Sequence, residues 1–130
     1  MKKLFFIPIL LFTLIFSSNA YSKWTKVTET TDGNQYYLDY DRIRKVDGYL
    51  YYWYLSNFAQ PINGRIYSAS NYAQGDCKLL RFKRVSTTAF KRPMGKGFIG
   101  SRPHKKKNQD WDYPHPNSPM ESVLRSVCDN

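Results

Sequence analysis

The chain has 130 residues, with 20 Lys or Arg against 10 Asp or Glu, and a formal net charge of +10. This length fits one domain, and no stretch after residue 20 is apolar enough for a membrane-spanning helix, which excludes a multi-spanning membrane protein. The basic balance predicts an acidic partner such as lipopolysaccharide, anionic lipid, sulfated glycan, acidic protein or nucleic acid. Alternatively, the charge only keeps an aromatic-rich domain soluble.

Residues 1–20 are predicted to be a signal peptide. Lys2 and Lys3 precede a short apolar run at residues 4–16, and Ser18 and Ala20 supply small side chains where a signal peptidase reads the chain. The run is too short to span a bilayer comfortably, although an uncleaved anchor is the alternative. We therefore expect one mature domain, residues 21–130, in the periplasm or at the cell surface.

Short strand-forming segments separated by turn signals follow the predicted signal peptide. Asp-Gly or Asn-Gly pairs at residues 32–33, 47–48 and 63–64 mark turns, and Pro61 is expected to end the third strand. Residues 40–44 could form one helical turn or a bulged continuation of the second strand. The six expected strands span residues 24–29, 35–39, 49–58, 65–73, 77–86 and 97–101. The short connections predict an antiparallel meander.

The carboxyl end changes from strand to helix periodicity. Ser118 can cap a helix, Pro119 suits the first helical position, and Glu121 completes a capping box. The apolar side of this helix, which spans about ten residues, is expected to hold Met120, Val123, Leu124, Val127 and Cys128. A helix this short is marginal in water by itself, so it needs support from the rest of the domain.

Two cysteines, Cys77 and Cys128, are expected to supply that support. An even cysteine count in an exported protein predicts a disulfide, which would tie the helix to the fifth strand. A metal site is the weaker alternative because two distant cysteines provide too few ligands. The expected fold is therefore α+β: an antiparallel meander of about six strands with a C-terminal helix packed on it and tied by a disulfide.

Both faces of the expected strand at residues 49–58 are aromatic. Tyr49, Tyr51 and Trp53 lie on one face, and Tyr52 and Tyr54 lie on the other. One small helix can cover only part of one face of a six-stranded sheet. Curling of the sheet, the long loop, a second protomer or a ligand must cover the rest, so a homodimer is one expected assembly.

Residues 100–118 form a long segment without periodicity, which is typical of a functional or disordered loop. Its basic cluster suits sulfate, phosphate or carboxylate, and its tryptophan offers a cation–π surface, although a plain solvated loop is the alternative. The expected ligand contacts are Arg102, His104, Lys105, Lys106, Lys107 and Trp111.

No motif for catalysis is present. There is no GxSxG elbow or Gly-rich phosphate cradle, and the spacing of His104 and His115 does not support a nuclease. These histidines could bind haem iron or zinc, but no CxxCH or HExxH motif accompanies them. We therefore expect a binding protein rather than an enzyme, with no resident cofactor and no nucleic-acid partner. The alternatives are a haem or metal carrier and a dimeric structural envelope protein.

A series of short elements runs along nearly the whole chain after residue 23. Its members are Trp24, Val27, Tyr36-Tyr37-Leu38-Asp39, Ile43-Arg44, Val46, Gly48, Tyr52-Trp53-Tyr54-Leu55, Tyr67-Ser68, Asp76-Cys77-Lys78, Met94-Gly95-Lys96-Gly97, Trp111, Pro116-Asn117-Ser118 and Val127-Cys128. In this order the elements resemble the surface-adhesin protein E family of Gram-negative bacteria.

The resemblance implies an antiparallel sheet with a disulfide-tied C-terminal helix and an extracytoplasmic location. It also implies adhesion to host matrix or serum proteins, with haem binding as a further attributed property. The sequence departs from the family in lacking a lipidation cysteine at the expected mature start, and the basic run at Lys105–Lys107 is not part of the pattern. Only Cys77 and Cys128 therefore carry over by motif.

Overall fold

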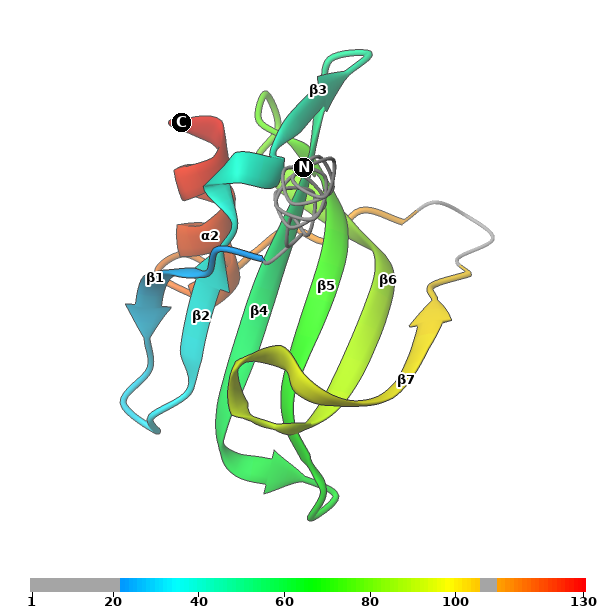
Figure 1. Ribbon diagram of the computed structural model, residues 1–130. Helices are drawn as coiled ribbons and strands as arrows, with labels where there is room; N and C mark the ends of the chain where they lie inside the picture. Colours follow the sequence, from blue (N-terminus) through cyan, green and yellow to red (C-terminus); the bar gives the residue numbers. More distant parts are fainter. Residues whose placement is uncertain (1–21, 106–109) are drawn as a thin grey trace, which may run out of the picture.

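The structure is a computed structural model that describes residues 22–105 and 110–130. The predicted signal peptide and two of the expected ligand contacts, Lys106 and Lys107, lie outside the described residues. The described chain forms one antiparallel sheet of seven strands with a C-terminal helix on it (Figure 1). This architecture confirms the α+β fold that the sequence predicts.

Six strands follow one another across the sheet in chain order, apart from a short strand that pairs only with the long central one. That short strand, β3 (Arg44–Val46), was not among the expected strands; it pairs with the start of β4. The six others are β1 (Thr25–Glu29), β2 (Gln35–Leu38), β4 (Tyr49–Ile62), β5 (Ile66–Asp76), β6 (Arg81–Arg92) and β7 (Lys96–Pro103).

The Asp47-Gly48 turn shows how local sequence shapes the sheet. Both residues have positive φ, 53° and 84°, and they join β3 directly to β4. A two-residue hairpin turn of this kind matches the right-handed twist of its strands, and Asp followed by Gly adopts it readily. This predicted turn is confirmed.

Several predicted strand limits are wrong, and the largest difference is that β6 ends at Arg92 rather than at residue 86. Strand β4 continues through Pro61 to Ile62. Proline is tolerated there because the pairing with β5 is interrupted between Asn57 and Ile62, so the strand requires no backbone N–H donor at that position. Strand β5 extends to Asp76, beyond its expected end at residue 73. Strand β6 begins at Arg81 rather than at residue 77, because the backbone amides of residues 78 and 79 donate to the Asp76 carboxylate and form a turn.

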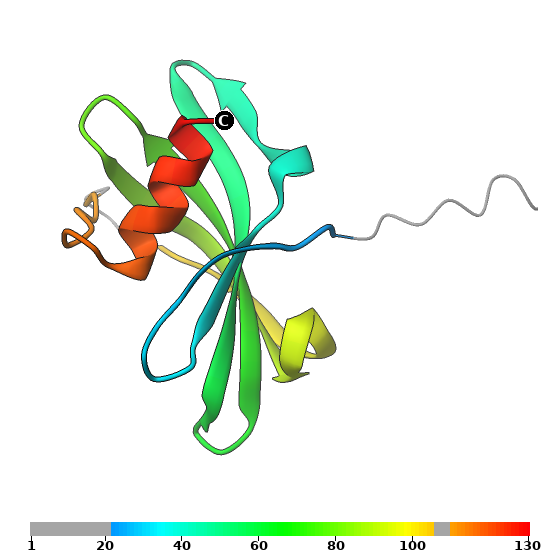
Figure 2. The ribbon, with the colours of Figure 1, turned by 90° about the vertical axis from the view of Figure 1, so that its left-hand side faces the viewer.

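The C-terminal helix α2 (Pro119–Cys128) begins as predicted. The Ser118 Oγ accepts a hydrogen bond from the Glu121 amide at 3.2 Å, and the Glu121 carboxylate accepts one from the Asn117 amide at 2.9 Å. These bonds satisfy amides that an uncapped helix end would leave without partners. The helix packs on β1, β2 and β4 on one side of the sheet (Figure 2). The core between helix and sheet comprises Leu38, Tyr52, Tyr54, Ala73, Phe82, Val123, Leu124 and Val127.

A disulfide joins Cys77 to Cys128, with a Cα–Cα distance of 5.7 Å. The predicted bond is confirmed, but Cys77 lies in the turn between β5 and β6 rather than in a strand. The bond therefore anchors the last turn of α2 to a turn at the end of the sheet.

Two short 3₁₀ helices complete the fold. The helical-turn alternative for residues 40–44 is the correct one: η2 (Tyr40–Arg42) is capped by the Asp39 carboxylate. The second, η3 (Pro93–Gly95), lies across the sheet from α2 (Figure 2). Its Gly95 approaches Leu55, which is fully buried on that side. The two faces of the sheet are thus covered by different segments.

Candidate functional site

The face of the sheet opposite α2 carries a cluster of half-buried aromatic rings. Alternation along β4 directs its odd-numbered side chains to this face. The Trp53 and Tyr72 ring centroids are 4.8 Å apart, and those of Tyr51 and Tyr72 are 5.9 Å apart. Tyr49 packs on Trp111, which follows the β7 segment, at 5.5 Å. We call these five residues the aromatic face.

Arg42 binds the aromatic face from the η2 side. Its guanidinium carbon lies 4.9 Å from the Trp53 ring centroid and 5.7 Å from that of Trp24. The Arg42 Nε donates to the Asp39 Oδ2 at 2.7 Å, and the Asp39 side chain is only 2% exposed. Arg44 donates to the Tyr72 hydroxyl at 3.0 Å. One cation, Arg42, therefore lies over the rings, and a second, Arg44, contacts a hydroxyl of the cluster.

Trp111 contacts two cations of β6. The Arg81 guanidinium carbon and the Lys83 Nζ each lie 4.3 Å from its ring centroid. The next residue, Asp112, exchanges two backbone hydrogen bonds with Phe82, at 3.0 and 2.8 Å, and so continues the sheet edge. The Trp111 ring, an expected ligand contact, is already engaged within the chain.

Asp76 fixes Arg81 in this arrangement. The Arg81 Nε donates to the Asp76 Oδ2 at 2.8 Å, and the backbone amides of Lys78 and Leu79 donate to Oδ1. The hydrogen bond from Arg81 and these amide bonds lower the pKa of Asp76 below its usual value, although its burial opposes the shift. The carboxylate therefore stays charged beside its arginine at neutral pH.

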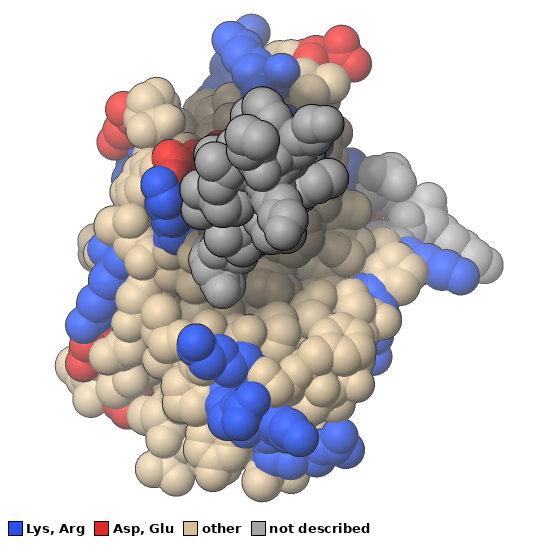
Figure 3. Space-filling view, viewed as in Figure 1, with Lys and Arg blue, Asp and Glu red and all other residues tan. Residues whose placement is uncertain are grey.

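The strongest concentration of charge lies in the hairpin of β6, η3 and β7. Residues 77–105 contain no Asp or Glu and nine cations, Lys78, Arg81, Lys83, Arg84, Lys91, Arg92, Lys96, Arg102 and Lys105. Figure 3 shows basic side chains gathered over the lower part of the face opposite α2. We call Lys91, Arg92, Lys96 and Phe98 at this end the basic hairpin.

The geometry of the basic hairpin brings its cations together. Arg92 and Lys96 are paired across β6 and β7. A Cβ placed on Gly97 would lie 2.7 Å from the Lys91 Cγ and 3.3 Å from the Arg92 Nε, so both side chains fold over this glycine. Phe98 beside them is 67% exposed. An exposed aromatic ring among cations is a typical composition for a protein-binding surface.

The sheet separates the ligand contacts expected from sequence. Arg102 lines a groove on the α2 side, where the His104 Nε2 is 2.6 Å from the Thr87 Oγ1. Trp111 belongs to the opposite face, and Lys105 is exposed. The described members of the expected site thus do not form one patch, and their role in ligand binding stays a prediction. From the sequence, the basic group at residues 78–92, which includes Lys91 and Arg92, is interpreted as mostly structural protection of an edge strand, so the basic hairpin is not predicted as a site. The absence of acidic residues from 77 to 105 is the sequence signal that could have indicated it.

The groove on the α2 side has a volume of about 810 Å³. It lies on the part of the sheet that α2 leaves uncovered, between β2 and β7, and Met120 at the start of the helix forms part of its wall. Its lining is mostly apolar, with Arg84 and Arg102 as its charged members. Volumes of this order are typical of small-molecule sites.

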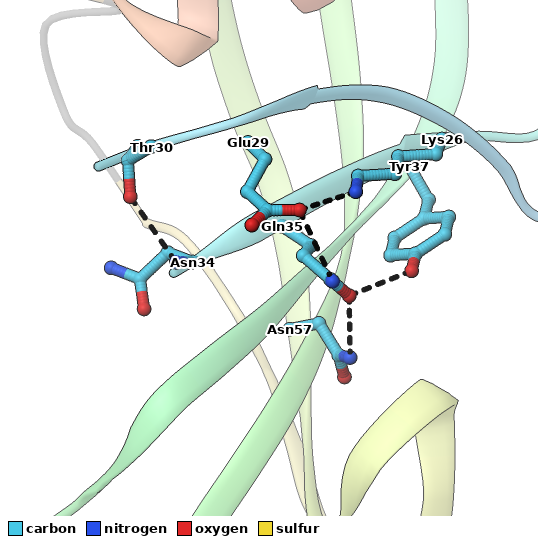
Figure 4. Close-up of polar contacts among 7 residues, drawn as sticks. All are labelled: Lys26, Glu29, Thr30, Asn34, Gln35, Tyr37 and Asn57. Carbon is cyan, nitrogen blue, oxygen red and sulfur yellow. Dashed lines mark hydrogen bonds and ion pairs between the residues drawn. The ribbon is translucent and has the colours of Figure 1, made fainter. Parts of the chain in front are cut away.

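A cluster of polar side chains at the β1–β2 edge makes its hydrogen bonds among its own members (Figure 4). The Gln35 Oε1 accepts from the Tyr37 hydroxyl at 2.8 Å and from the Asn57 Nδ2 at 3.3 Å, while its Nε2 donates to Glu29 at 3.3 Å. Lys26 pairs with the same glutamate. These contacts join β1, β2 and β4, so the cluster has a structural role.

Residues 22–105 and 110–130 hold neither a cluster of metal ligands nor a membrane-spanning helix. Within these ranges no three His, Cys, Asp or Glu side chains come together as metal ligands. No helix there is both long and apolar enough to cross a membrane.

The fold and the surface define a small α+β domain with a disulfide-tied helix and with exposed cations and aromatic rings on the face opposite that helix. The surface-adhesin protein E family matches residues 24–129, and the chain belongs to this family. Membership indicates an adhesin-like protein that acts outside the cell or at its surface. No curated protein matches the sequence.

Solved structures of Haemophilus influenzae protein E share the fold. One crystal form is 16% identical, with a TM-score of 0.60 over 86% of this chain and 91% of that one. Protein E from non-typeable Haemophilus influenzae is 15% identical, with a TM-score of 0.54 over 87% of this chain and 80% of that one. At such identities the likeness establishes the fold alone.

Proposed function

We propose that the chain is an exported, non-enzymatic adhesin that binds an acidic segment of an extracellular protein through the basic hairpin. The mature domain acts at the surface of a Gram-negative bacterium after removal of residues 1–20. The observation that carries the proposal is the gathering of Lys91 and Arg92 over Gly97, between Lys96 and the exposed Phe98 in the chain, in a stretch without a single carboxylate.

The composition of the basic hairpin favours a protein partner over a bare polyanion. Clustered cations attract acidic groups and accelerate their encounter with the surface. An exposed phenylalanine adds apolar area that only a partner with apolar side chains can bury. An acidic segment interrupted by apolar residues satisfies both features.

The test measures binding of the mature domain to immobilised extracellular matrix and serum proteins, with heparin and lipopolysaccharide alongside, across a salt series. Lys91→Glu with Lys96→Glu reverses two charges of the basic hairpin. The matched control, Lys45→Glu with Lys78→Glu, makes the same charge change at exposed positions outside it. We expect the hairpin variant to bind at least about tenfold more weakly, or about 1.4 kcal/mol, and the control to change little.

Three outcomes would contradict the proposal. Equal losses in both double variants would mean that net charge alone governs binding. Undiminished binding of the hairpin variant would remove the basic hairpin from the site. If Phe98→Ser leaves binding to every protein unchanged while heparin binding depends on the lysines, the partner is a glycan.

The aromatic face has a second candidate use, as the contact between two copies of the chain. Its rings are half-buried; Arg42 lies over Trp53, and Arg44 donates a hydrogen bond to the Tyr72 hydroxyl. Sedimentation equilibrium of the mature domain tests this use, and a monomer at high concentration rejects it. Trp53→Ser should dissociate the dimer while leaving binding through the basic hairpin intact.

A further inference from the structure

The groove on the α2 side is hollow because small residues stand in register across four strands. Ser56, Ala69, Ala89 and Gly100 are successive cross-strand partners on β4, β5, β6 and β7. Their side chains reach only a short way from the sheet, and α2 does not extend over them. The depression is therefore built into the strand pairing.

The apolar part of the lining surrounds this row of small residues. Phe58, Ile62 and Ile66 lie at the end of the β4–β5 hairpin, Ile99 lies on β7, and Met120 lies at the start of α2. Ile62 is 44% exposed, which is high for a large apolar side chain. A hydrocarbon chain laid along the groove would cover these groups and remove them from water.

The neighbouring cross-strand row is polar. Tyr54, Asn71, Thr87 and Arg102 are successive partners on β4 to β7, and Arg84 lies one row further along. The Thr87 hydroxyl donates to the Asn71 Oδ1 at 2.7 Å. One border of the groove thus carries hydroxyls, an amide and two guanidinium groups, and among the described residues no Asp or Glu lines it, although the charge of Asp112 reaches Tyr54 from behind this border.

Tyr54 supplies an independent sign of a ligand. Its side chain is 1% exposed, and its hydroxyl is the buried polar atom of the described residues that has no hydrogen-bond partner. A buried hydroxyl without a partner is unfavourable by about 1–3 kcal/mol. Burial raises the pKa of Tyr54 to about 12, so the hydroxyl keeps its proton and can donate it to an acceptor.

We infer that the groove binds a long-chain fatty acid, with the hydrocarbon tail over Ala69, Ala89 and the surrounding isoleucines and the carboxylate at the border formed by Tyr54, Arg84 and Arg102. Two guanidinium groups without a lining carboxylate complement one anionic head group. The tyrosine hydroxyl gains the acceptor that it lacks. This site is separate from the basic hairpin and takes a small molecule instead of a protein.

The test titrates oleate, below its micelle concentration, into the mature domain after extraction of co-purified lipid, with calorimetry as the readout. Saturable binding of one oleate per chain is expected. Arg84→Ser with Arg102→Ser should weaken it at least tenfold, whereas Lys45→Ser with Lys78→Ser, with the same charge change, should not. Oleyl alcohol, which has the tail without the charge, should bind at least tenfold more weakly than oleate.

Gly100→Phe provides a second, steric variant. A Cβ placed on Gly100 meets no atom within 4 Å, so the new ring can enter the groove without disturbing the backbone. We expect this variant to fold normally and to lose oleate binding.

The inference is overturned if oleate does not saturate, if oleyl alcohol binds as well as oleate, or if Gly100→Phe binds like the unchanged protein. Binding to phosphatidylglycerol vesicles without binding of monomeric oleate would also overturn it, in favour of a membrane surface. The Lys91→Glu, Lys96→Glu variant should keep full affinity for oleate, which separates this site from the proposed adhesive function.

Discussion

Leu124 of α2 packs directly on the backbone of Gly75 in β5. A Cβ placed on Gly75 would lie 3.0 Å from the Leu124 Cδ1 and 3.1 Å from the Tyr52 Cε1. The helix therefore docks at a point where the sheet presents backbone and no side chain. This contact sets how closely α2 approaches the sheet, and the disulfide two residues later along the chain, at Cys77, holds it there.

Gly75→Ala should destabilise the domain because the added methyl group has no space. Leu124 or Tyr52 must shift, and overpacking of this kind costs about 1–3 kcal/mol. Equilibrium urea unfolding measures the change. Gly100→Ala is the matched control, since its Cβ meets nothing within 4 Å and should leave stability within about 0.5 kcal/mol. Equal stability of the two variants would show that α2 adapts freely.

Cys77→Ser with Cys128→Ser should lower the free energy of unfolding by roughly 4 kcal/mol, because the cross-link spans 51 positions of the chain and restricts the unfolded state. The loss should appear in urea unfolding, with α2 as the first element to lose amide protection in hydrogen exchange. A double variant as stable as the parent protein would mean that core packing alone secures the helix.

Asp76 predicts a particular dependence of stability on pH. Because the folded state lowers its pKa, mainly through the hydrogen bond from Arg81, the charged carboxylate stabilises the domain above the unfolded value of about 4. This stabilisation is lost as the pH falls through the lowered pKa. The difference in unfolding free energy between the parent and Asp76→Asn should be constant from pH 7 to about 5 and shrink in more acidic solution. A constant difference down to pH 2 contradicts the assignment, and the exposed Asp32→Asn serves as the control.

Tyr54→Phe should be neutral, or stabilising by up to about 1 kcal/mol, at pH 7 because the lost hydroxyl has no partner among the described residues. The pKa of Tyr54 is raised to about 12, above the unfolded value of about 10, so the unfolded chain releases this proton first. This group therefore does not change the free energy of unfolding with pH below about pH 10. Between about pH 10 and 12 the domain loses stability, because unfolding lets the hydroxyl ionise. Unfolding measured across this range should show a smaller alkaline loss for Tyr54→Phe than for the parent or for Tyr67→Phe, whose side chain is 37% exposed.

Local patterns in the sequence predicted the C-terminal helix and every strand of the sheet except β3, although several strand limits differ. The Asp47-Gly48 pair predicts its hairpin because only a few residue types adopt positive φ readily, and the capping box at Ser118 predicts where α2 begins because its bonds are local. Cys77 and Cys128 predict their pairing because no other cysteine is present. The family resemblance and the family match agree on the same architecture.

The tertiary structure alone decided which side chains meet. Alternation assigns Arg102 and Trp111 to faces only once the strand limits are known, and the structure places them on opposite sides of the sheet. The register that aligns Ser56 with Gly100 across four strands is set between irregularities in β4, β6 and β7 that no local pattern marks. Strand register and helix docking arise from contacts between residues distant in the chain. These contacts determine the positions of the core under α2, of the groove beside it and of the basic hairpin.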